Sequence, residues 1–179
     1  MAATTQLITV EEFRKLPEND GAFYYELRHG EVARVTRPTL KHHRIQRHLR
    51  KFLEAASGDA GIVETELAYR ALPEYELRVA DVAWVPRERW EQADLNDNLR
   101  GTPDLVIEVL SPSNTATEIY DKEKLCLENG CREFWVVDPD RRQVKVSTPD
   151  GITTTFQAGQ QVPLRLLGGS LMAVDAIFA

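Results

Sequence analysis

The sequence has no long hydrophobic segment and few cysteines. No apolar run approaches the ~18 residues that a membrane-spanning helix needs, and residues 1–5 lack the charged and apolar regions of a signal peptide. We therefore expect a cytoplasmic protein without membrane contacts. The 2 cysteines, Cys126 and Cys131, are too few for a disulfide framework, and a single pair does not indicate a zinc site.

The sequence motifs of several large enzyme classes are also missing. The chain contains no P-loop, no GxGxxG fingerprint, no GxSxG elbow and no HExxH helix. The chemistries that depend on these motifs therefore have no support in this sequence.

Length and composition are those of an ordinary globular protein. The chain has 179 residues, of which 42% are hydrophobic and 28% are charged. One domain of this length buries a sizeable core, whereas two domains would be crowded. We expect a single domain over residues 1–179.

Basic residues gather in one segment of an otherwise acidic chain. The net charge of −6 argues against a general affinity for nucleic acid, but residues 34–51 contain seven lysines and arginines, three histidines and no acidic residue. A local basic patch is a better guide to a polyanionic partner than the total charge. A solvated helix face explains the same pattern. The candidate nucleic-acid contacts are Arg37, Lys41, Arg44 and Lys51.

The order of expected elements indicates a mixed sheet flanked by helices. Capping-box patterns and apolar residues at helical spacing predict helices near 9–16, 41–56 and 116–128. Alternating or continuous apolar runs predict strands at 23–28, 31–35, 62–68, 77–85, 105–110, 133–138, 143–147, 153–156 and 164–167. Residues 86–103 are expected to form a loop with some helix. This order predicts an α/β (α+β) fold with a mixed central β-sheet.

Two carboxylates interrupt apolar strands. Asp81 lies within residues 79–85, and Glu108 lies within residues 105–110. A buried carboxylate is costly unless a partner compensates its charge, and a divalent metal is one such partner. Glu108 is expected about 7 Å before the end of its strand, and Lys122 roughly 10 Å along the following helix. The two residues can therefore lie at similar heights if the helix folds back over the sheet.

This trio predicts a metal-dependent phosphodiesterase site. Asp81 and Glu108 would bind Mg²⁺, or Mn²⁺, and Lys122 would orient a water or neutralise developing negative charge. Ordinary ion pairs are the alternative: Asp81 with Lys122, and Glu108 with an arginine such as Arg78 or Arg132.

Three further residues are candidate accessories to this site. Glu26 follows an aromatic strand, and His42 opens the basic helix. Asp104 shares a strand face with Glu108 if the strand is regular. It could serve as an outer metal ligand, or it could be a turn residue at the start of the strand.

At these residues the chain resembles the Uma2 (DUF820) family of restriction-endonuclease-like proteins, a branch of the PD-(D/E)xK nuclease superfamily. The resemblance covers nearly the whole length, and it rests on several matched segments. These are Tyr25-Glu26-Leu27-(x)2-Gly30-Glu31, His42, Asp81-Val82-Ala83-Trp84-Val85, Pro103 to Ser113, Lys122, Gly130, and Glu133 to Pro139.

The resemblance implies a restriction-endonuclease-like fold with an aspartate, a glutamate and a displaced lysine at the site. Those roles fall on Asp81, Glu108 and Lys122, since Leu110 occupies the usual position of the lysine. Two departures are Ala80 in place of a proline and Cys126 in place of a tyrosine. Neither removes a proposed ligand.

The sequence thus favours a Mg²⁺- or Mn²⁺-dependent endonuclease that cleaves DNA. The chief alternative is a catalytically silent domain on a nuclease scaffold that binds nucleic acid or another partner. A metal-independent acid/base hydrolase with paired carboxylates is a third interpretation. A homodimer is expected if both strands of a duplex are cut, since two sites do this most simply.

Overall fold

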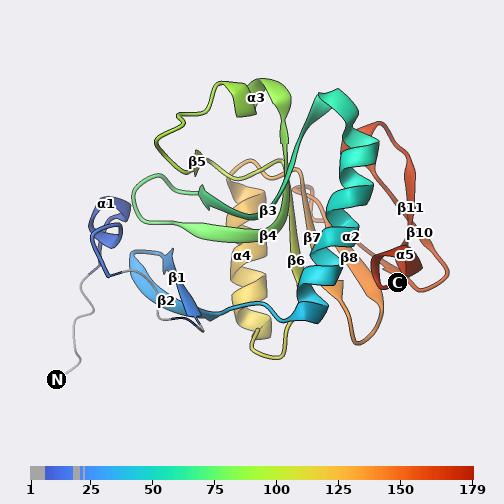
Figure 1. The fold of residues 1–179 in the computed structure, drawn as a ribbon, viewed down its shortest axis with the longest axis horizontal. Coiled ribbons are helices and arrows are strands. Elements are labelled where there is room, and N and C mark those ends of the chain that lie inside the picture. The colour runs from blue at the N-terminus through green and yellow to red at the C-terminus, as the bar shows by residue number, and fades with distance from the viewer. Residues whose placement is uncertain (1–6, 18–20, 22) are drawn as a thin grey trace.

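A seven-stranded mixed β-sheet forms the centre of the molecule (Figure 1). The computed structural model describes residues 7–17, 21 and 23–179. The strand order is β5-β3-β4-β6-β7-β8-β9. Strand β6 is parallel to β7 and β3 is parallel to β5, while the other neighbours are antiparallel. The strands are β3 (Gly61–Arg70), β4 (Arg78–Pro86), β5 (Leu99–Arg100), β6 (Leu105–Val109), β7 (Glu133–Asp138), β8 (Gln143–Ser147) and β9 (Thr153–Gln157). The predicted mixed sheet is confirmed.

Two long helices cover opposite faces of this sheet. Helix α2 (Leu40–Ser57) buries Ile45 and Leu49 in one apolar cluster, and α4 (Ala116–Glu128) buries Leu125 in the other. Successive side chains of a strand point to opposite faces, so Ile107 of β6 joins the α2 cluster and Val106 joins the α4 cluster. The same alternation places Glu108 on the α4 face.

The predicted capping boxes define the starts of two helices. Thr115 accepts a hydrogen bond from the backbone of Glu118, whose side chain accepts one from the backbone of Thr115, and α4 begins at the next residue, Ala116. Thr9 and Glu12 form the same motif at the start of α1 (Val10–Phe13). This reciprocal arrangement satisfies backbone N–H groups that would otherwise lack partners.

A separate hairpin lies beside α4 (Figure 1). Strands β1 (Phe23–Arg28) and β2 (Glu31–Thr36) pair antiparallel and turn at His29 and Gly30, as predicted. Backbone hydrogen bonds between Leu27 and Leu77, of 2.9 and 3.0 Å, attach the hairpin to the segment before β4. This attachment brings Glu26 of β1 to the α4 side of the main sheet.

Near the C-terminal end, the predicted strand at 164–167 is wrong. Arg165–Leu167 form a short 3₁₀ helix, η2, between the paired strands β10 (Gln161–Pro163) and β11 (Leu171–Ala173). Leu164 and Leu167 are buried because a 3₁₀ helix places residues three apart on one face.

Strand β5, which has only two residues, was not expected. The remaining elements are η1 (Gly58–Ala60), α3 (Arg87–Glu91), which confirms the expected helical part of 86–103, and α5 (Val174–Ile177).

The helices of the described residues include none with the length and apolarity required to cross a membrane.

Candidate active site

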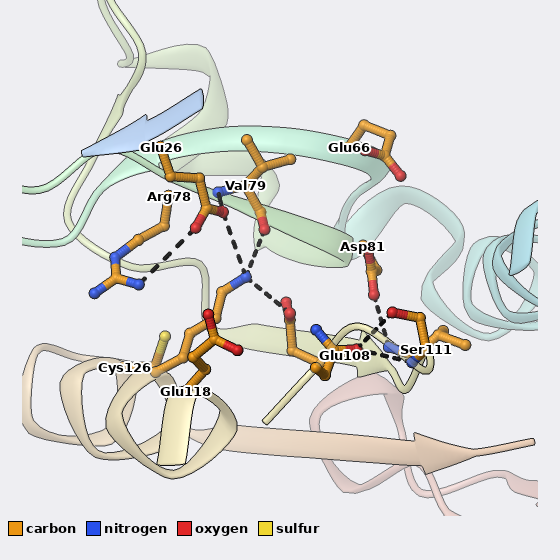
Figure 2. Close-up of polar contacts among 12 residues, drawn as sticks. Glu26, Glu66, Arg78, Val79, Asp81, Glu108, Ser111, Glu118 and Cys126 are labelled. Carbon is orange, nitrogen blue, oxygen red and sulfur yellow. Dashed lines mark hydrogen bonds and ion pairs between the residues drawn. The ribbon is translucent and has the colours of Figure 1, made fainter. Parts of the chain in front are cut away.

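Glu108 and Lys122 form a buried ion pair between β6 and α4. Nζ of Lys122 donates to Oε2 of Glu108 at 2.8 Å (Figure 2). The helix folds back over the sheet after the loop at Ser111, so the two residues reach similar heights, as the spacing predicted. The alternative ion pair between Glu108 and Arg78 is not formed. Glu108 pairs with Lys122, whereas Arg78 pairs with Glu76 at 2.7 Å.

Lys122 has two further acceptors around its ammonium group. Nζ donates to the backbone oxygen of Val79 at 2.6 Å and lies 3.8 Å from Oε1 of Glu26. Burial lowers the pKa of Lys122, but the charges of Glu108 and Glu26 outweigh it, so the pKa lies above its usual value. The lysine is therefore held as a cation.

Glu26 is fixed from the hairpin side of the site. Its Oε1 accepts from the backbone N–H of Val79 at 3.0 Å, and its Oε2 accepts from Nε of Arg28 at 3.0 Å. Burial raises the pKa of Glu26, but the charges of Lys122, Arg28 and Arg78 together lower it below its usual value. Glu26 is thus an ionised side chain that helps to position the lysine.

Asp81 lies next to Glu108 in the sheet but has different partners. Its Oδ2 accepts from the backbone N–H of Val109 at 2.7 Å and contacts Nε2 of His42 at 3.1 Å. Nε2 of His42 also lies 3.1 Å from the backbone oxygen of Val109. Burial lowers the pKa of His42, but the hydrogen bond and charge of Asp81 raise it above the usual value. The first turn of α2 is thereby tied to Asp81 within β4 and to Val109 at the end of β6.

The pKa of Glu108 is also strongly perturbed. Burial raises its pKa to about 8, against the opposing effect of the Lys122 charge, and the neighbouring Asp81 charge adds to the increase. Its second oxygen, Oε1, is buried and has no hydrogen-bond partner among the described residues. Glu108 therefore has a lone pair free for a ligand.

These side chains line one cavity of about 240 Å³. Besides the ion pair, it is bordered by polar groups of the hairpin, of β4, of the segment 37–42 that leads into α2 and of the loop after β6. Among them are Tyr24, Glu26, Arg28, Arg37, His42, Asp81, Ser111, Ser113 and Asn114. The cavity thus brings together Asp81, Glu108, Lys122, Glu26 and His42 from separate parts of the sequence.

The sequence matches the Uma2 family, described as "Putative restriction endonuclease", over residues 10–174. The chain belongs to the Uma2 family. The fold agrees with a crystal structure described as "a putative nuclease belonging to DUF820" from Anabaena variabilis ATCC 29413. The TM-score is 0.81 at 24% sequence identity, and the match covers 96% of this chain and 97% of that chain. No match was found among the curated proteins.

Asp104 lies outside the cavity of this Uma2 protein. It precedes β6, at the opposite end from Glu108, and its Oδ2 accepts from Nη1 of Arg89 at 3.0 Å. Its backbone oxygen accepts from the N–H groups of Arg132 and Glu133. These contacts fit the alternative of a turn residue at the start of the strand.

The predicted nucleic-acid contacts occupy two places. Arg37 lines the cavity and is exposed. Arg44 and Lys51 lie on the exposed side of α2, whereas Lys41 forms an exposed ion pair with Asp140 at 3.2 Å. Arg37 therefore lies at the cavity in the loop before α2, whereas Lys41, Arg44 and Lys51 line other surface pockets along the helix.

Glu66 is a residue at this site that the sequence interpretation missed. The register of β3 and β4 places it opposite Asp81, between the pairs Thr65–Val82 and Leu67–Ala80. Its backbone has φ of 54°, which is uncommon for a residue other than glycine. Its Oε1 accepts from Nε2 of Gln46. Nothing in the local sequence distinguishes Glu66 from Glu64, the other glutamate on the strand.

Proposed function

We propose that this protein is a divalent-cation-dependent endonuclease that hydrolyses phosphodiester bonds of DNA. The observation that carries the proposal is the 2.8 Å contact between Lys122 and Glu108 in the cavity that also contains Asp81. A lysine held as a cation beside two carboxylates suits a reaction in which a phosphate gains negative charge. Membership of the Uma2 family supports a nuclease.

The residues present fit a divalent cation. Asp81 and Glu108 offer carboxylate oxygens, the ligands that Mg²⁺ prefers, and Oε1 of Glu108 is buried without a partner among the residues described. We therefore assign Asp81 and Glu108 as its ligands. When bound, such an ion supplies charge neutralisation at the phosphate and a water of lowered pKa.

The role of Lys122 follows from its surroundings. Because the charges of Glu108 and Glu26 keep the ammonium protonated, Lys122 is a poor general base. It is suited to donate a hydrogen bond to a phosphate oxygen and to stabilise the charge that develops there. Glu26, at 3.8 Å from Nζ, positions this group without touching the substrate.

The basic side of α2 supports DNA as the substrate. Arg37 at the cavity can contact a phosphate near the cleavage position, and Arg44 and Lys51 can contact phosphates farther along the same strand. Contacts of this kind position a nucleic acid but do not read its sequence. We therefore expect binding with little sequence preference from this helix.

A cleavage assay tests the proposal. Plasmid and linear duplex DNA are incubated with the protein in Mg²⁺, in Mn²⁺ and in excess chelator. We expect cleavage only with a divalent ion, and its loss in Asp81→Asn, Glu108→Gln and Lys122→Met. Lys124→Met, an exposed lysine on the same helix, is the matched control and should retain activity.

Two results would overturn the proposal. Cleavage that persists in chelator or in Glu108→Gln would indicate a different chemistry or a contaminant. Binding of DNA without cleavage in either ion would instead favour the silent nucleic-acid-binding domain.

A further inference from the structure

Three side-chain donors from three elements meet beside the cavity. His42 of α2, Glu66 of β3 and Asp81 of β4 each offer one ligand atom, and these atoms all lie within 4.8 Å of one another. Ligands of one transition-metal ion lie roughly 3–4.5 Å apart, because each is about 2.0–2.2 Å from the metal. Only small side-chain shifts separate this arrangement from one that binds an ion.

Two neighbouring atoms are buried without a partner in the described part of the chain, and one of them, Oε1 of Glu108, points independently to a ligand. Nδ1 of His42 and Oε1 of Glu108 are buried and lack hydrogen-bond partners among the described residues. The two residues are only 8% and 6% exposed, and both line the cavity together with Asp81. Buried polar atoms are normally paired, so the free lone pair of Glu108 is explained if a cation occupies this place.

Binding of a cation by His42 requires a change of tautomer. Nε2 faces two oxygens, Asp81 Oδ2 and Val109 O, each at 3.1 Å, and so carries a proton in this arrangement. A cation at the same oxygens requires Nε2 to offer its lone pair, with the proton on Nδ1. This change gives up the contacts of Nε2–H with Asp81 and Val109 and places a proton on Nδ1, which has no partner among the described residues, so the bond between Nε2 and the cation must compensate for both.

We infer that the cation held at Asp81 is also bound by His42 and Glu66, so that the site selects a first-row transition-metal ion over Mg²⁺. An imidazole nitrogen favours such ions, whereas Mg²⁺ prefers oxygen ligands and keeps much of its water. The inference rests on the proposed function only because both use Asp81 as a ligand.

Calorimetric titration with Mn²⁺ and with Mg²⁺ tests the selectivity. We expect the wild-type protein to bind Mn²⁺ more tightly, and Glu66→Gln to lose about 10-fold or more in Mn²⁺ affinity with a smaller effect on Mg²⁺. Glu66 is exposed, so this variant should fold. Glu64→Gln, on the same strand and outside the donor group, is the matched control. Equal Mn²⁺ affinities of the two variants would overturn the inference.

Electron spin echo spectroscopy of bound Mn²⁺ gives a second readout. A coordinated imidazole produces nitrogen modulation, which we expect in the wild type and in Glu64→Gln, and which should disappear in His42→Gln. Bound Mn²⁺ without nitrogen modulation in the wild type would contradict the role of His42. His42 would then serve only to tie α2 to Asp81 and Val109.

The two proposals can fail separately. Cleavage with Mg²⁺ that depends on Glu108 but not on Glu66 would refute the added ligands and leave the nuclease proposal intact. Mn²⁺ binding that depends on Glu66 and His42, in a protein that cleaves no DNA, would refute the nuclease and retain the metal site.

Discussion

Nζ of Lys122 lies 2.8 Å from Oε2 of Glu108, and each side chain keeps only 8% of its surface exposed. The two residues are separated by 14 positions that contain the end of β6, the following loop and the first half of α4. A buried ion pair contributes little net stability, because desolvation offsets much of the attraction. The pair is therefore better explained by a function at this site than by stability of the fold.

Removing the lysine should destabilise the protein. In Lys122→Met the buried carboxyl group of Glu108 loses its hydrogen-bond donor and the charge that opposes the rise of its pKa, so it stays protonated and without a partner. This loss costs about 1–3 kcal/mol of unfolding free energy at neutral pH. Lys124→Met changes an exposed side chain and should alter stability by no more than about 0.5 kcal/mol. Chemical denaturation of both variants measures the difference. Similar stabilities would show that Glu108 and Lys122 do not interact as described.

The pH dependence of stability should report on Glu108. Its pKa is about 8 in the folded protein and near 4.5 when unfolded, so the folded state binds more protons between these values. The contribution of Glu108 to stability is therefore complete below about pH 4.5 and is lost as the pH rises through 8. In chelator, Glu108→Gln should gain stability relative to the wild type between pH 5 and pH 8.

The control for this pH effect is Glu128→Gln, an exposed glutamate on α4. The denaturation curves of Glu128→Gln should follow those of the wild type at pH 5 and at pH 8. A constant difference between Glu108→Gln and the wild type across the range would contradict the raised pKa.

The basic side of α2 should control the salt dependence of DNA binding. Each phosphate contact lowers the slope of log affinity against log salt by about 0.9. The double variant Arg44→Ala with Lys51→Ala should therefore weaken binding and make the slope shallower by about 2. Fluorescence anisotropy at several salt concentrations gives the slope. Lys124→Ala serves as the control, and an unchanged slope in the double variant would exclude α2 as the contact surface.

Local signals in the sequence were sufficient for the main elements. The reciprocal pair Thr115 and Glu118 fixes the first residue of α4, and the continuous apolar run at 105–110 identifies a strand buried on both faces. Both depend on residues close together in the chain. The central sheet and its two covering helices could therefore be predicted without tertiary information.

Elements that depend on tertiary contacts could not be predicted in this way. Leu164 precedes the short 3₁₀ helix that contains Leu167, and both leucines are buried in the apolar cluster that also contains Ile107 of β6, a residue distant in the sequence. Strand β5 exists because Leu99 and Arg100 pair with the end of β3. Such short segments have little intrinsic preference of their own.

Some residues of the candidate site could likewise be predicted from the sequence, and one could not. Carboxylates inside apolar runs marked Asp81 and Glu108, and helix geometry brought Lys122 within reach of Glu108. Glu66 gave no comparable signal, since its approach to Asp81 depends on strand register and on a backbone conformation that the sequence does not specify. The metal-binding and catalytic roles of these residues remain predictions.

Calorimetric titration of Mg²⁺ into the metal-free wild type and Glu108→Gln tests the central claim most directly. The account predicts binding by the wild type and its loss in Glu108→Gln, with Glu128→Gln unaffected. Binding of the same strength by Glu108→Gln, or no divalent-cation binding by the wild type even with DNA present, would contradict the proposed metal-dependent nuclease site.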